Sequence, residues 1–196
     1  MTLPLFPLNT VLFPGCTLDL QIFEARYLDM IGRCMKQGEG FGIVCILEGR
    51  EVGEAASAHA EIGCEARVLD FQRQDNGLLG IRIEGGRRFQ VESVEVQRDQ
   101  LILAQVSWLQ EHPDVPLQGE DEDLLALLTA LADHPLVAAL DLGGTPTGRQ
   151  GLANRLAYLL PFDERDKLDL LEMTDPTIRL AMVQELLERM QGDLQA

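Results

Sequence analysis

The segment that comes nearest to a phosphate-binding loop is GGTPTGRQG, at residues 143–151. Such loops need glycines followed by Lys and by Ser or Thr, because these groups bind the phosphate oxygens and the metal. Here Arg149 follows the glycines, and the Gly-Lys-Ser/Thr ending is missing. The segment is therefore predicted to be a flexible loop between helices and not a nucleotide site.

Side chains that could act as a nucleophile or a metal ligand are few and scattered. None of the three serines, Ser57, Ser93 and Ser107, stands in a G-x-S-x-G motif. The three histidines lie far apart, without the H-E-x-x-H spacing of a zinc enzyme. A triad assembled by the fold would leave no signature in sequence, but the motifs predict no catalytic and no metal-binding residue.

The four cysteines stand in apolar segments, and none belongs to a C-x-x-C pair: Cys16, Cys34, Cys45 and Cys64. Zinc sites usually take ligands in such closely spaced pairs, so a metal site is disfavoured. We expect buried free thiols, which persist in a reducing cytoplasm.

The chain is strongly acidic, with a net charge of −16 and only two lysines. Residues 1–112 carry 10 basic and 16 acidic side chains, and residues 113–196 carry 6 and 16. Nucleic-acid binding depends on Lys and Arg that neutralise phosphates, so this charge disfavours a nucleic-acid partner. It is typical of a solvated acidic surface, or of one that favours basic partners.

No part of the sequence predicts a membrane segment or an export signal. No apolar run approaches the roughly 20 residues that a spanning helix needs. The apolar start is broken by Pro4, Pro7 and Pro14, and no basic residue precedes Arg26. We therefore expect a soluble, cytoplasmic protein without a membrane partner.

The first elements are predicted to be two strands and a helix. Between Cys16 and Ile22 apolar and polar side chains alternate, which is the period of a half-buried strand. An apolar stripe at helical spacing follows and predicts a helix over 24–36, ended by Gly38.

The remainder of the first half follows strand patterns. Turns are predicted at Asp75-Asn76-Gly77 and at Gly85-Gly86, where the pair of glycines would join two strands. Six or more short strands with one early helix predict a closed or nearly closed barrel. The expected strands after the helix cover residues 41–47, 62–68, 78–84, 87–96 and 101–109.

Helical patterns begin after the Pro- and Gly-containing segment 112–119. Apolar stripes predict helices from Leu124, over 152–160 and from Asp163, and Thr174-Asp175-Pro176 is typical of a helix start. The sequence thus predicts an α+β protein with a barrel over 1–115 and a helical bundle over 116–196.

The opening stretch LPLFPLNTVLFPGCTLDLQIFEARYLDMI resembles the start of the Lon substrate-binding domain. That domain begins the ATP-dependent Lon proteases and occurs as a stand-alone protein and in cereblon. Later segments are similar to the family in the same order: FGIV at 41–44, Ile62-Gly63-Cys64, IRIEGGRRFQV at 81–91 as a strand–Gly–Arg hairpin, and LANRLAYLLPFDERDKLDLLEMTDPTIRL at 152–180. Asp19 and Gln21 depart from the family pattern, and residues 134–151 fit it poorly.

The resemblance implies a PUA-like β-barrel followed by a helical bundle, with a role in recognising polypeptides for proteolysis. The 196 residues leave no room for the ATPase and Ser-Lys protease domains of full-length Lon. We therefore expect a non-catalytic module without a cofactor, which acts as an adaptor with a protease or chaperone. The alternatives are an RNA-binding PUA-like protein and a hydrolase assigned by transfer from Lon.

A peptide is expected to bind in an apolar groove where helix 24–36 and the barrel meet the helical module. Such a groove with an acidic rim would favour extended segments that mix apolar and basic residues. From the residues alone, Glu24 and Arg26 are favoured to fix the strand–helix junction, with a peptide contact as the alternative. Phe6, Phe13 and Phe23 are likewise favoured as core or module-interface residues. The residues expected to contact the peptide are Phe13, Pro14, Phe23, Arg26 and Tyr27.

Overall fold

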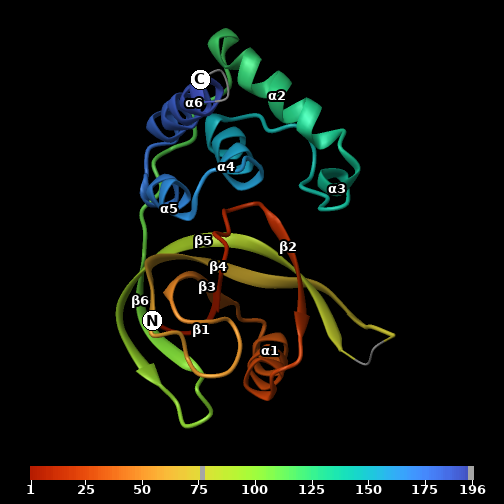
Figure 1. Cartoon of the computed structure of the whole chain (residues 1–196), viewed down its shortest axis with the longest axis vertical. Helices are drawn as coiled ribbons and strands as arrows, with labels where there is room; N and C mark the ends of the chain where they lie inside the picture. The colour runs from red at the N-terminus through yellow and green to blue at the C-terminus, as the bar shows by residue number, and fades with distance from the viewer. Residues whose placement is uncertain (76–77, 194–196) are drawn as a thin grey trace. The chain divides into compact units, whose positions relative to one another are not determined.

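A computed structural model of the protein describes residues 1–75 and 78–193. The chain forms two compact units, Met1–Leu109 and Gln110–Ala196. The first unit contains the strands and helix α1, and the second contains the remaining helices (Figure 1). The predicted turn at 75–77 lies largely outside the described residues.

The first unit is a six-stranded sheet, as the strand patterns predicted. Its order is β2-β5-β4-β3-β1-β6, and a further pairing joins β5 to β6. The pairings among β5, β4, β3, β1 and β6 therefore form a circuit, with β2 attached to β5 outside it. The elements are β1 (Thr2–Leu8), β2 (Thr17–Ile22), α1 (Ala25–Gln37), β3 (Phe41–Glu48), β4 (Ala58–Arg73), β5 (Leu79–Val96) and β6 (Ile102–Trp108).

The predicted hairpin at Gly85-Gly86 is wrong, because β5 continues through both glycines as one strand of 18 residues. Gly85 instead permits a close approach of two backbones. Its N–H donates to the carbonyl of Cys16, and its own carbonyl accepts from the N–H of Gly15, both at 2.8 Å. A Cβ on Gly85 would stand 2.2 Å from the carbonyl oxygen of Phe13. A glycine is thus needed at this position because the backbone of Phe13 leaves no space for a Cβ, and not because the chain turns there.

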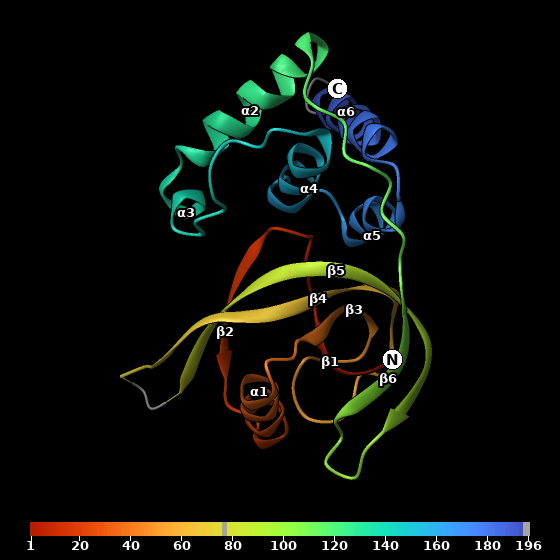
Figure 2. The same ribbon diagram turned by 180° about the vertical axis from the view of Figure 1, so that it is seen from behind.

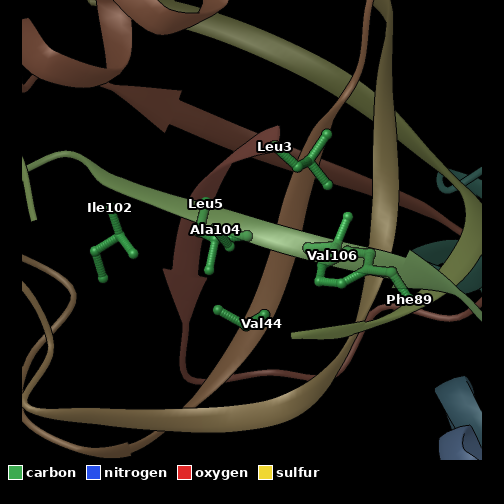
Figure 3. Close-up of a cluster of buried hydrophobic side chains, with 7 residues drawn as sticks. All are labelled: Leu3, Leu5, Val44, Phe89, Ile102, Ala104 and Val106. Atoms are coloured by element: carbon green, nitrogen blue, oxygen red, sulfur yellow. The ribbon is translucent and has the colours of Figure 1, made fainter. Parts of the chain in front are cut away.

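Strands β1, β3, β5 and β6 contribute apolar side chains to the core of the sheet unit. Every second residue of β6 points inward, as does every second residue at the start of β1, so apolar side chains gather on one side of each strand. Figure 3 shows one such cluster, formed by Leu3, Leu5, Val44, Phe89, Ile102, Ala104 and Val106. The four cysteines are buried thiols outside any disulfide bond, as expected.

Strand β2 leads directly into α1 (Figure 2). The predicted helix is confirmed, with its apolar stripe of Tyr27, Met30, Ile31 and Cys34 buried. It ends at Gly38, which adopts the left-handed conformation with φ 68°. The N–H of Gly38 closes the last turn on the carbonyl of Cys34.

The second unit contains five α-helices in its described part: α2 (Glu122–Ala132), α3 (Pro135–Ala138), α4 (Arg149–Leu159), α5 (Glu164–Glu172) and α6 (Pro176–Asp193). Helix α4 contacts α2, α5 and α6. Asp163 caps α5 by accepting the N–H of Asp166 at 2.7 Å, and Asp175 accepts the N–H of Thr177 at 2.8 Å at the start of α6. These helix starts were predicted, whereas α3 was not. Among the described helices, none has both the length and the hydropathy to cross a membrane.

Candidate peptide-binding groove

The residues that the sequence analysis considered for catalysis or for phosphate or metal binding do not form a chemical site. The basic residue of the 143–151 segment, Arg149, donates from Nε to Asp121 at 2.9 Å and also binds the carboxylate of Glu120. Both hydrogen bonds raise the pKa of Arg149, so it holds the start of α4 as a cation that is already paired. Within residues 1–75 and 78–193, no group of three His, Cys, Asp or Glu side chains could hold a metal ion.

A hollow of about 170 Å³ lies beside β2 and the residues that join it to α1. Its walls come from β1, β2, the start of α1 and the segment after β3. The lining residues are Phe6, Leu8, Asp19, Leu20, Gln21, Ile22, Phe23, Glu24, Tyr27, Glu51 and Val52. We call this hollow the β2 groove.

Phe6 and Tyr27 form an aromatic pair in the β2 groove. Their ring centroids lie 4.0 Å apart at 52°, and both side chains are buried. Burial raises the pKa of Tyr27 to about 12, an effect that the nearby Arg26 guanidinium partly offsets. The phenol is therefore neutral at physiological pH, and the base of the groove carries no charge there.

The rim of the groove is apolar in part. Phe23 is 52% exposed and Val52 is 53% exposed, so both present apolar surface to solvent. An apolar side chain of a ligand could pack against the exposed Phe23 and the buried aromatic pair next to it.

Three carboxylates also line the groove, and each already has a polar contact. Asp19 accepts two hydrogen bonds from Arg82, at 2.7 and 2.8 Å. Glu24 pairs with Arg26 at 3.0 Å, and Glu51 accepts the N–H of Asn9 at 2.6 Å. The lining includes no Lys, Arg or His. The groove therefore combines an apolar base with three carboxylates, two of which are paired with arginines.

Arg26 fixes the junction of α1 rather than lining the groove. It is buried, and its Nη1 donates to the carbonyl of Gln100 at 2.8 Å. The guanidinium lies 4.6 Å from the ring centroid of Tyr27. Arg26 thus ties the start of α1 to the turn between β5 and β6.

Of the five residues expected to contact a peptide, the structure brings Phe23 and Tyr27 together at the groove. Phe13 is fully buried in the core, and Pro14 is half-buried beside it. The expected position of the groove against the helical module stays a prediction, because every lining residue belongs to the first unit.

Sequence reasoning missed Phe6, Leu8, Glu51 and Val52 as lining residues. Phe6 and Leu8 belong to the strand-patterned opening stretch, which could have placed them near the helix start. Glu51 and Val52 come from a segment without periodicity, and no sequence signal pointed to them.

A second hollow, of about 450 Å³, lies on the sheet at the other side of β2. It shares Asp19, Leu20 and Gln21 with the β2 groove, but its other walls come from β4 and β5. Phe71 of β4 is 56% exposed there.

Replacing Asp19 by asparagine is expected to lower the free energy of unfolding at neutral pH by less than about 1 kcal/mol, because the ion pair is exposed. The hydrogen bonds from Arg82 lower the pKa of Asp19 below its ordinary value of 3.8. A lowered pKa in the folded state adds stability that is present above the unfolded pKa and is lost as pH falls through the folded one. Urea unfolding in neutral and in strongly acidic buffer should show the difference between the two proteins shrinking in acid. A difference that grew in acid would contradict the role of Arg82.

Residues 2–189 match the family model of the ATP-dependent protease La (LON) substrate-binding domain. The chain belongs to this family. The resemblance inferred from the ordered segments is thereby confirmed.

Solved structures agree with the Lon assignment. The Lon N-terminal domain protein from Xanthomonas campestris is 34% identical, with a TM-score of 0.77 over 94% of this chain and 98% of that one. The N-terminal domain of the Lon protease from the Mycobacterium avium complex is 21% identical, with a TM-score of 0.66 over 95% and 97%. The second similarity concerns the fold alone.

Curated Lon relatives are much longer proteins. The Lon protease of Flavobacterium johnsoniae is 23% identical over 134 residues, which are 68% of this chain and 16% of the relative. The cereblon of Danio rerio is 29% identical over 113 residues, 56% of this chain and 26% of the relative. The Lon domain described here therefore spans about a sixth and a quarter of these two proteins.

Proposed function

We propose that this Lon substrate-binding domain is a non-catalytic module that binds extended polypeptide segments in the β2 groove. The observation that carries the proposal is the half-exposed Phe23 beside the buried Phe6–Tyr27 pair, in a domain of a substrate-binding family. A hollow of about 170 Å³ accepts one aliphatic or aromatic side chain, which suits a segment of unfolded chain better than a folded surface.

We also propose a domain organisation and a cellular role for this binding module. The circuit of strand pairings supports a PUA-like barrel as the first domain, and the mutual contacts of α2, α4, α5 and α6 support a helical bundle as the second. We place the boundary of the two folding domains near residue 115. A protease or chaperone in the cytoplasm would receive the bound chain, which makes the protein an adaptor in protein quality control.

Affinity for such segments should be modest. The apolar contacts supply most of it, because exposed ion pairs contribute only about 0–1 kcal/mol each. Binding in the micromolar range is the expected result, with a weak dependence on salt.

Phe23→Ala is expected to weaken binding of unfolded casein by about five- to tenfold. Fully burying a Phe side chain is worth about 1.5–3 kcal/mol, roughly half of which remains available at a half-exposed position. Fluorescence anisotropy of labelled casein, titrated with each protein, measures the change.

The matched control is Phe71→Ala, which removes an equally exposed Phe from β4 outside the β2 groove. Circular dichroism and the fluorescence of Trp108 verify that both variants are folded. Equal losses in the two variants would remove Phe23 from the site, and no casein binding by the wild type would refute the proposed function.

A further inference from the structure

Strand β2 has one edge without a partner strand. It stands at the end of the strand order and, among the described pairings, it joins β5 alone. Six consecutive residue pairs connect the two strands without a bulge, from Thr17↔Glu84 to Ile22↔Leu79. The edge of β2 away from β5 is therefore regular in form.

The phase of the pairing fixes which backbone groups face that edge. Gly85 donates to the carbonyl of Cys16, so these two residues occupy a hydrogen-bonded position of the antiparallel ladder. Hydrogen-bonded and non-hydrogen-bonded positions alternate along such a pair. Asp19 and Gln21 then fall at non-hydrogen-bonded positions, and their N–H and C=O groups point away from β5.

The β2 groove lies on this outward side. It takes its walls from β2, β1, α1 and the segment at Glu51 and Val52, and no residue of β5 lines it. The second hollow, in contrast, includes Gly80, Ile81 and Arg82 of β5. The outward backbone of β2 therefore borders a space that can receive a side chain.

The sequence of β2 itself also lacks residues that block strand addition at many edges. Proteins protect such edges with Pro, with Lys, with bulges or with inward-pointing charges. The strand sequence TLDLQI has no Pro and no Lys, and its one charged side chain, Asp19, is held by Arg82 of β5.

We propose that an extended segment of a partner polypeptide adds to β2 as a further strand and places one apolar side chain in the β2 groove. This inference rests on the proposed function and names its binding mode. Of the three carboxylates that line the groove, Asp19 and Glu24 are paired with arginines, whereas Glu51 accepts a backbone N–H. A Lys or Arg of the partner segment, beside its apolar side chain, would pair with Glu51.

The probe is the peptide acetyl-Lys-Val-Thr-Phe-Thr-Val-Lys-amide, labelled for anisotropy. Two methylated forms test the backbone: one carries N-methyl groups on both Val and on Phe, the other on both Thr. Residues two apart in a strand direct their N–H groups to the same edge. One form should therefore lose affinity by about tenfold or more, and the other should stay within about twofold.

The matching variant of the protein is Gln21→Pro, which removes the outward N–H of residue 21. An edge strand tolerates the proline ring when that N–H does not bond to the neighbouring strand. Gln21→Thr is the matched control, because it retains the N–H and favours a strand. We expect about tenfold weaker peptide binding by the first variant and little change by the second.

Each outcome decides between the two levels of the proposal. Equal binding of all three peptides, or no peptide binding while casein binds, would overturn strand addition and leave polypeptide recognition standing. Failure to bind casein would overturn the proposed function itself. A dimer in sedimentation analysis that Gln21→Pro abolishes would assign the edge to a second copy of the chain and also overturn the inference.

Discussion

Gly85→Ala is expected to lower the free energy of unfolding of the sheet unit by about 3 kcal/mol or more. The new Cβ would stand 2.2 Å from the carbonyl oxygen of Phe13 and 3.2 Å from the Sγ of Cys64. Neither neighbour can withdraw easily, because Phe13 and Cys64 are fully buried and Gly85 is bonded to Gly15 and Cys16. The clash can be removed only if β5 moves away from the turn before β2.

Urea unfolding followed by the fluorescence of Trp108 measures this change, because the chain has a single Trp and it lies in β6. The matched control is Gly86→Ala, whose Cβ would come no closer than 3.3 Å, to the carboxylate of Glu65. The control should cost less than about 1 kcal/mol. Equal stabilities of the two variants would mean that the turn before β2 can shift with little loss of stability, which would contradict the prediction.

Arg179→Met is expected to destabilise the helical unit by about 3 kcal/mol. The Arg179 side chain is 1% exposed. Its Nε donates to the carbonyl of Leu170 at 3.0 Å, and its Nη2 donates to the carbonyl of Met173. Both carbonyls belong to the end of α5, where helical carbonyls lack partners within the helix. Nη1 donates to Asn154 of α4 at 2.8 Å, so one side chain joins two helices to α6.

The comparison variant is Arg165→Met, which removes an exposed guanidinium from α5. It should change stability by no more than about 0.5 kcal/mol. Far-ultraviolet circular dichroism during urea unfolding follows the helices in both variants. A loss of similar size at both positions would indicate a general effect of charge and not the cap on α5.

Much of the fold could be predicted because its elements carry their own signals. The alternation in TLDLQI marks β2, and the capping side chains of Asp163 and Asp175 mark the starts of α5 and α6. Gly85-Gly86 was misread because the reason for a glycine there is the backbone of Phe13, more than seventy residues earlier in the chain. Helix α3 has four residues, too few to show a period.

The candidate site was predictable only in part. Phe23 and Tyr27 could be proposed because they flank a helix start that the sequence shows. Whether Phe13 faces solvent depends on the packing of distant strands, which periodicity does not report. The free edge of β2 depends on strand order, and Glu51 and Val52 reach the groove through a segment without a pattern.

The position of β1 has a consequence for synthesis on the ribosome. This strand lies between β3 and β6, and Thr2 is hydrogen-bonded to Gln105, 103 residues further along. The nascent chain therefore cannot complete its first unit until β6 has left the exit tunnel. Until then the apolar side chains of Leu3 and Leu5 lack the β6 part of their core. The first strand of this unit to be made is thus the one whose final neighbours are completed last, and it is where an emerging chain would need protection from aggregation.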